Sequence, residues 1–113
     1  MKKNFIKNID FSTALTLADL VAYQQGQVVS KTLAQNPAVS LTVFAFDQAE
    51  EISSHESSGD AMMIALDGEA EITIGSEKHI VKAGQTIIMP ANIPHAVYAS
   101  QQFKMFLIVV FPN

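Results

Sequence analysis

The chain of 113 residues contains neither cysteine nor arginine, and each absence removes a group of functions. Without cysteine, no disulfide, no thiolate metal site and no thiol nucleophile can form. Arginine is the usual bidentate partner of carboxylates and phosphates, so a site for strongly anionic substrates would have to rely on lysine. These absences favour a small ligand that is uncharged or weakly polar.

Long runs of basic residues and long runs of apolar residues are missing as well. No run of Lys or Arg occurs and the formal net charge is -4, which argues against nucleic acid or an anionic membrane surface as a partner. The longest apolar stretches are far shorter than a membrane span. The basic start Met1–Asn8 is followed by no apolar segment and no cleavage site of a signal peptide. We therefore expect a cytoplasmic protein.

What the chain does contain predicts one all-β domain over residues 1–113. Hydrophobic residues make up 49%, enough for one core. Short β-branched or alternating segments recur between turns, without a long amphipathic helix, as in small sandwiches and barrels. The first 25 residues are predicted to form an extended arm, with strand favoured over helix for Leu17–Tyr23. The strands predicted after the arm cover residues 28–33, 39–46, 62–66, 69–74, 78–81, 86–89, 95–99 and 103–111.

One hairpin can be predicted down to its register. Gly75-Ser76 is a two-residue loop between residues 69–74 and the strand that returns from Lys78. A turn is predicted at Asp67-Gly68, just before this hairpin. The resulting opposed pairs are Glu69 with Lys82 and Thr73 with Lys78 on the polar face, and Ile72 with His79 on the apolar face.

Two segments resemble the conserved motifs of the cupin superfamily. Residues 59–74 are similar to the first motif, and residues 84–95, with Pro90 six residues after Gly84, are similar to the second. The resemblance covers roughly Val39 to Val110. It implies a double-stranded β-helix, or jelly-roll barrel, with its site in the mouth. It also implies a homodimer in which the N-terminal arms are exchanged or packed across the interface.

The resemblance also implies where a divalent metal would bind. In cupins the first motif supplies two histidines separated by one residue and then a glutamate, and the second motif supplies a third histidine. His55 matches the second histidine of the pair, and His95 matches the histidine of the second motif. Ser53 stands where the first histidine would be. The implied ligand set is therefore incomplete.

The glutamate position has two candidates. Counting back from Gly68 gives Ala61, which has no ligand atom, whereas counting forward from His55 gives Asp60, which has one. Adjacent strand positions face opposite sides, so only one of them can point into the barrel. We favour Ala61 because the strand pattern leading to Gly68 is the firmer anchor.

The other candidate site residues are interpreted as lining. His79 is more simply a partly buried histidine of an edge strand than a metal ligand. Pro90 and Pro94 are expected to order the loop that sets the angle of His95. The predicted pocket consists of Ser53, Ala61, Met63, Phe44, Met89 and Phe106.

Together these observations predict a barrel that binds a small molecule, with Fe, Mn, Ni, Cu or Zn held by His55 and His95. The alternative is a metal-dependent dioxygenase or isomerase of the cupin type, which needs at least three protein ligands and an open position. A third alternative is a structural or regulatory partner domain, which would show a blocked barrel mouth and a large exposed apolar patch.

Overall fold

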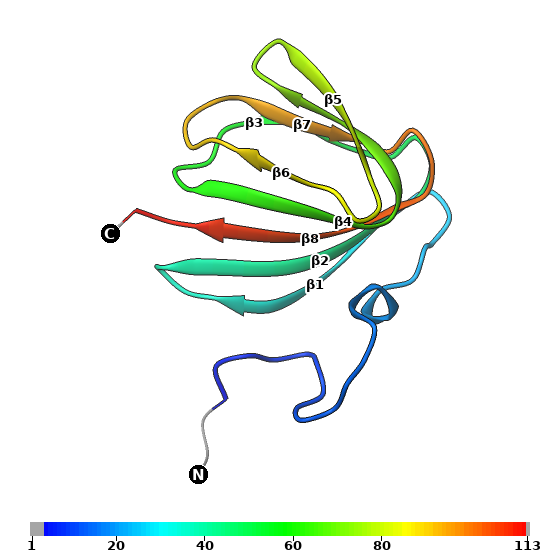
Figure 1. Cartoon of the computed structure of the whole chain (residues 1–113), viewed down its shortest axis with the longest axis vertical. Helices are drawn as coiled ribbons and strands as arrows, with labels where there is room; N and C mark the ends of the chain where they lie inside the picture. Colours follow the sequence, from blue (N-terminus) through cyan, green and yellow to red (C-terminus); the bar gives the residue numbers. More distant parts are fainter. Residues whose placement is uncertain (1–3, 113) are drawn as a thin grey trace.

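Eight strands and one short 3-10 helix make up the chain in a computed structural model that describes residues 4–112. The predicted all-β class is confirmed, and the antiparallel strands curl into the predicted jelly-roll barrel (Figure 1). Asn113 and the first three residues of the predicted arm lie outside the described residues. The elements in chain order are η1 (Leu17–Leu20), β1 (Val28–Gln35), β2 (Val39–Phe46), β3 (Glu51–His55), β4 (Asp60–Ile74), β5 (Glu77–Lys82), β6 (Thr86–Met89), β7 (His95–Tyr98) and β8 (Phe103–Val110).

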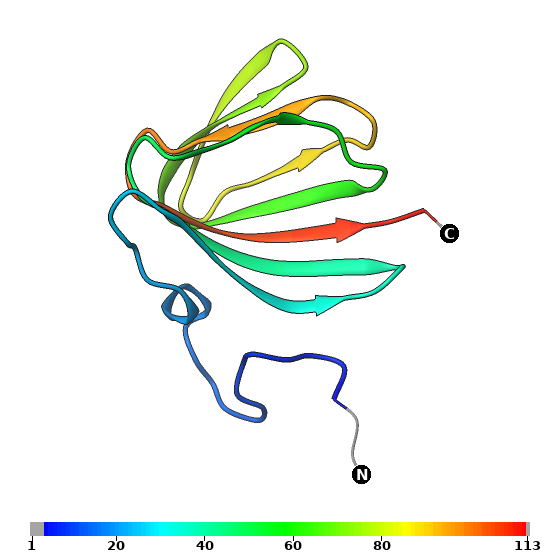
Figure 2. The same cartoon turned by 180° about the vertical axis from the view of Figure 1, so that it is seen from behind.

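β4 connects the two walls of the barrel because its halves pair with different strands. Its first half pairs with β6 and β8, and its second half pairs with β5 and β7. The strand order is β1-β2-β8-β4-β7-β3, with β5 and β6 attached to β4 beside this path. Figure 2 shows β3 running alongside β7. Among residues 4–112, no helix is long and apolar enough to cross a membrane.

The bend that carries β4 from one wall to the other lies at Gly68. This residue has a φ of 68°, and the ladder with β8 is irregular between Ala65 and Asp67. A Cβ at Gly68 would collide with the backbone carbonyl oxygen of Gln102, so the site requires glycine for both conformation and space. The turn predicted at Asp67-Gly68 is therefore wrong. The chain does not reverse there, because neighbouring strands supply backbone partners on both sides of the bend.

The predicted hairpin register is confirmed. Glu69 pairs with Lys82, Ile72 with His79 and Thr73 with Lys78. By contrast, β3 is absent from the predicted strands. Within it only Ile52 is even partly buried, so no alternation of apolar residues marks it in the sequence.

The main core lies between the two walls of the barrel. Alternate residues of β4, β8 and the other strands point into it, including Phe46, Met63, Ile72, Phe103 and Met105, which are almost completely buried. A second, smaller apolar cluster lies on the outer face of β1, β2 and β8, around Leu33, Val43 and Ala45. This outer cluster is where the N-terminal segment packs.

The N-terminal segment covers the outer face of its own barrel. Ile9, Leu17 and Leu20 pack against the outer cluster, on the side of β1 and β2 away from β5, β6 and β7 (Figure 1). The strand predicted for Leu17–Tyr23 is wrong, because η1 occupies Leu17–Leu20 and Asp19 N–H donates to the Thr16 carbonyl. A short turn lets the segment change direction as it crosses the sheet, which an extended strand could not do.

Polar contacts fix this segment at the end of the barrel that contains the Gly68 bend. The Tyr23 hydroxyl donates to Asp67, and Lys104 Nζ lies 5.0 Å from the centroid of the Tyr23 ring and donates to the Ala18 carbonyl. Burial, followed by the hydrogen bond to Asp67 and the charge of that carboxylate, raises the pKa of Tyr23 above its ordinary value.

Nearby, Asp47, which follows β2, binds the end of the N-terminal segment just before β1. Its carboxylate accepts hydrogen bonds from the Gly26 N–H, the Gln48 N–H and the Gln102 side chain. These bonds, the one from Gly26 first, lower the pKa of Asp47 below its ordinary value because they favour the charged form.

Candidate functional site

The structure brings His55 and His95 together at the end of the barrel opposite the Gly68 bend. His55 ends β3, His95 begins β7, and the two residues are direct partners in the antiparallel ladder. Their ring centroids are 4.4 Å apart, with the rings edge to face at 63°. His95 is 4% exposed, whereas His55 is open to solvent. The pair therefore extends from the buried interior of the barrel, at His95, to its solvent-exposed mouth, at His55.

Each imidazole is oriented by a backbone carbonyl two residues earlier in the chain. His55 Nδ1 lies 3.0 Å from the Ser53 oxygen, and His95 Nδ1 lies 3.1 Å from the Ile93 oxygen. A carbonyl oxygen can only accept a hydrogen bond, so Nδ1 carries the proton in each neutral ring. The lone pair of each Nε2 is then available to a ligand.

The loop before His95 is tied to the segment after His55. Asn92 N–H donates to the Ser57 carbonyl, and Ala91 N–H donates to Asp60 Oδ1, each over 2.8 Å. Asn92 has a φ of 63°, a left-handed conformation that asparagine tolerates better than most residues. These bonds position the two histidine-bearing segments relative to each other.

Of the two candidates for the glutamate position, Ala61 is the one that faces the interior. Ala61 is 2% exposed, belongs to the main core, and pairs with Met89 of β6 and Val109 of β8. Asp60 points the other way, as alternation along a strand requires, and is exposed. Its Oδ1 accepts the Ala91 N–H, so this carboxylate anchors a loop outside the barrel.

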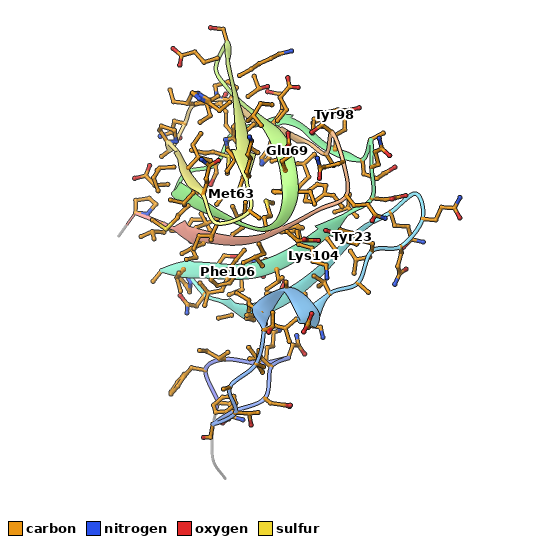
Figure 3. All side chains as sticks on the ribbon, turned by 45° about the vertical axis from the view of Figure 1, so that its right-hand side comes forward. Tyr23, Met63, Glu69, Tyr98, Lys104 and Phe106 are labelled. Carbon is orange, nitrogen blue, oxygen red and sulfur yellow. The ribbon has the colours of Figure 1, made fainter. Side chains whose placement is uncertain are left out.

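The predicted pocket residues separate into three groups. Phe44, Ala61, Met63 and Met89 belong to the core between the walls. Ser53 is exposed and supplies its backbone carbonyl to His55. Phe106 departs from the prediction: it lies on the outer face of β8, against the N-terminal segment, because it alternates with the inward-facing Met105 (Figure 3).

His79 lies in a different place from the histidine pair. It borders an open cleft of about 500 Å³ between the β4–β5 hairpin and β6. Ile74, Ile87, Ile88 and Pro90 supply the apolar lining, and neither His55 nor His95 is part of it. The cleft nevertheless adjoins the mouth, because Ile74 is the ladder partner of His95. The predicted register placed His79 opposite Ile72, which is correct, but it did not reveal the cleft.

The donors present at the mouth fit part of a metal site. Two imidazoles with free Nε2 atoms and carbonyl-bound Nδ1 atoms have the arrangement that metal-binding histidines normally show. In the part of the chain that the structure describes, no group of three or more His, Asp or Glu side chains could hold a metal ion. A metal here would rest on His55 and His95 and take its remaining ligands from outside the protein.

Comparison with known proteins agrees with this architecture. The cupin domain family (Cupin_2) matches residues 42–111, so the chain belongs to the cupin superfamily. No curated protein sequence matched the chain.

Solved structures include proteins that are similar over almost the whole chain. A conserved protein of unknown function from Streptococcus pyogenes is 47% identical, with a TM-score of 0.96 over 98% of this chain and 97% of that one. A cupin superfamily protein from Desulfitobacterium hafniense is 33% identical, with a TM-score of 0.91 over 95% and 98%. A cupin 2 conserved barrel domain protein from Leptotrichia buccalis is 41% identical, with a TM-score of 0.83 over 85% of this chain and 47% of that one.

Proposed function

We propose that this protein binds a small molecule at the barrel mouth, together with a divalent metal held by His55 and His95. The observation that carries the proposal is the pairing of two imidazoles whose Nδ1 atoms are both bound to carbonyls. The imidazole nitrogens suit Fe, Ni, Cu or Zn, and the oxygen ligands that would complete the site suit Mn as well. When bound, such a metal supplies a Lewis acid that polarises an oxygen of the ligand.

The residues beside the histidine pair form the surface that the ligand would contact. The body of the ligand would lie in the cleft between the β4–β5 hairpin and β6, against Ile74, Ile87 and Pro90. Polar groups in this cleft come from Ser76, Glu77 and His79. This mixture fits a small, weakly polar molecule, as the absence of arginine also suggests.

Binding is supported better than the dioxygenase or isomerase alternative. That alternative needs a third protein ligand, and the interior position that could supply one holds Ala61. Asp60 faces outward and is engaged with Ala91. We therefore propose binding as the function and assign no reaction.

We also propose that the chain forms a homodimer in the cytoplasm. Support for the dimer comes from apolar side chains left uncovered on the outer face of β4 and β8, where Met62 and Val110 are exposed. Val110→Asp is expected to give a monomer in light scattering after size exclusion. Ile80→Asp, at an equally apolar exposed position on β5, is expected to leave a dimer; a wild-type monomer would overturn the proposal.

Elemental analysis of protein purified without an affinity tag tests the metal site. We expect one of the named metals in stoichiometric amount in the wild type and its loss in His95→Ala. His79→Ala is the matched control and should keep the metal, since His79 lies in the adjoining cleft. Folded wild-type protein that holds no metal, even after incubation with each of these ions, would overturn the proposal.

A further inference from the structure

We propose that the cavity beneath the N-terminal segment binds a small amine, with the apolar body of the amine inside the cavity and its ammonium group beside Asp10. The cavity has a volume of about 360 Å³ and lies on the outer face of the sheet. Neither His55 nor His95 lines it, so this inference is independent of the proposed metal site.

The sheet supplies an apolar floor to the cavity. Leu33 of β1, Leu41 of β2 and Phe106 of β8 form this floor and belong to the outer cluster (Figure 3). Antiparallel ladders join the three strands, so the floor is in place before any ligand binds. A preformed apolar surface is what most small-molecule sites present.

The N-terminal segment supplies the opposite wall. Lys7 N–H donates to the Leu33 carbonyl, and the Asn8 side chain donates to the preceding carbonyl of β1, each over 2.8 Å. Asn8 and Ser12 have φ values of 63° and 58°, so a left-handed residue stands on each side of Ile9–Phe11. The segment is therefore fixed to β1 at one point and turns on both sides of the stretch that borders the cavity.

The chain itself covers this wall incompletely. Ile6 is 42% exposed and Phe11 is 53% exposed, although both line the cavity. A molecule in the cavity would remove part of this apolar surface from water, which is the main favourable term in binding an apolar group. The volume lies at the small end of the range for ligand sites, so it fits one ring with a short chain.

Asp10 determines the charge of the ligand. It is the only charged residue in the lining, and no lysine within residues 4–112 lines the cavity. A fatty acid or another anion would bring its negative charge next to this carboxylate. An ammonium group instead pairs with it, and a neutral molecule gains only from the apolar walls. Because Asp10 is exposed to solvent, we expect the ion pair to strengthen binding modestly, by about fivefold.

The direct test is an NMR titration of the isotope-labelled, full-length wild-type protein with three probes of nearly equal size: 2-phenylethylamine, 2-phenylethanol and phenylacetate. We expect the backbone amide signals of Asp10, Leu33 and Leu41 to shift, and those of His55 and His95 to stay in place. The amine should bind about fivefold more tightly than the alcohol, and the acid more weakly than either. Added salt should reduce the difference between amine and alcohol.

A matched pair of substitutions tests the role of Asp10. Asp10→Asn removes the charge at an exposed position, so the folded variant should bind amine and alcohol equally while its affinity for the alcohol is unchanged. Asp19→Asn removes the charge of an exposed carboxylate in η1, outside the lining, and should keep the preference for the amine.

Three results would overturn the inference. The first is equal affinity of the wild type for amine and alcohol, or binding of none of the probes. The second is a set of amine-induced shifts confined to residues outside the cavity. The third is a shift of the Asp10 and Leu41 signals on dilution without a probe, with no amine binding at any protein concentration, because a second copy of the chain would then fill the cavity.

Discussion

The Tyr23 hydroxyl donates a hydrogen bond to Asp67 Oδ2 over 2.5 Å, joining residues that are 44 positions apart in the sequence. Tyr23 follows the N-terminal segment, and Asp67 immediately precedes the glycine at which β4 changes walls. The bond therefore connects the N-terminal segment to the bend of β4. The contribution of this bond should be measurable in the free energy of unfolding and in its dependence on pH.

Replacing Tyr23 by Phe should lower the free energy of unfolding at neutral pH by about 1 kcal/mol, since one hydrogen bond is lost and Asp67 loses a donor. Urea unfolding followed by circular dichroism measures this change. Tyr98→Phe, on the exposed outer face of β7, is the control and should change stability little.

The same substitution should alter behaviour at alkaline pH. Because the pKa of Tyr23 is raised in the folded state, its contribution to stability is complete below the ordinary value of 10.0 and is lost as pH rises above it. The wild type should therefore lose more stability than Tyr23→Phe between pH 9 and 11. Equal losses in the two proteins would contradict the assigned role of the phenol.

Asp47→Asn should matter at neutral pH and much less in acid. The pKa of Asp47 is lowered in the folded state, so its carboxylate contributes stability above the ordinary value of 3.8 and loses that contribution as pH falls. The difference in urea midpoint between wild type and variant should therefore shrink from pH 7 to pH 3. A difference that stays constant over this range would show that charge is not the cause.

Gly68→Ala should be strongly destabilising, and Gly26→Ala should be a mild control. Both glycines have a φ of 68°, so both substitutions introduce the same backbone strain. Only at Gly68 would the new Cβ meet backbone atoms, whereas Gly26 has nothing within 4 Å. We expect Gly68→Ala to cost at least about 1 kcal/mol more than Gly26→Ala in thermal or urea unfolding.

Substitution of Asp60 distinguishes an anchor from a metal ligand. Asp60→Ala removes the acceptor of the Ala91 N–H and should cost about 1 kcal/mol of stability, while Asp60→Asn keeps an acceptor and should cost less. Neither variant should lower the metal content measured by elemental analysis. Loss of the metal in a folded Asp60→Asn protein would instead make Asp60 a ligand.

The features that sequence predicted best are those governed by alternation of side chains. The order of apolar and polar residues around Gly75-Ser76 determines the hairpin register, because a slip of one residue would expose Ile72 and bury Glu71. The same rule made Ala61, rather than Asp60, the interior candidate. Where neighbouring strands override a local signal, prediction failed, as at Asp67-Gly68, whose turn-like sequence serves as a bend within one strand.

The candidate site was only partly accessible to sequence reasoning. The resemblance to the cupin motifs related His55 to His95, but the acceptors of their Nδ1 atoms are backbone carbonyls, which carry no residue-specific signal. The outward position of Phe106 follows from its register with β2 and β4, which spacing alone does not give. The cleft beside His79 forms between the β4–β5 hairpin and β6, so the sequence of neither segment alone predicts it.

The attachment of both β5 and β6 to β4 has a mechanical consequence. In the portion described, neither strand pairs with the other, and the cleft lies between them. No ladder between described residues closes this side of the barrel, where a backbone bond from the Gly75 N–H to the Pro94 carbonyl ties the hairpin to the loop after β6. Separating the hairpin from β6 would break fewer backbone hydrogen bonds than separating two paired strands, so we expect the barrel to widen first on this side.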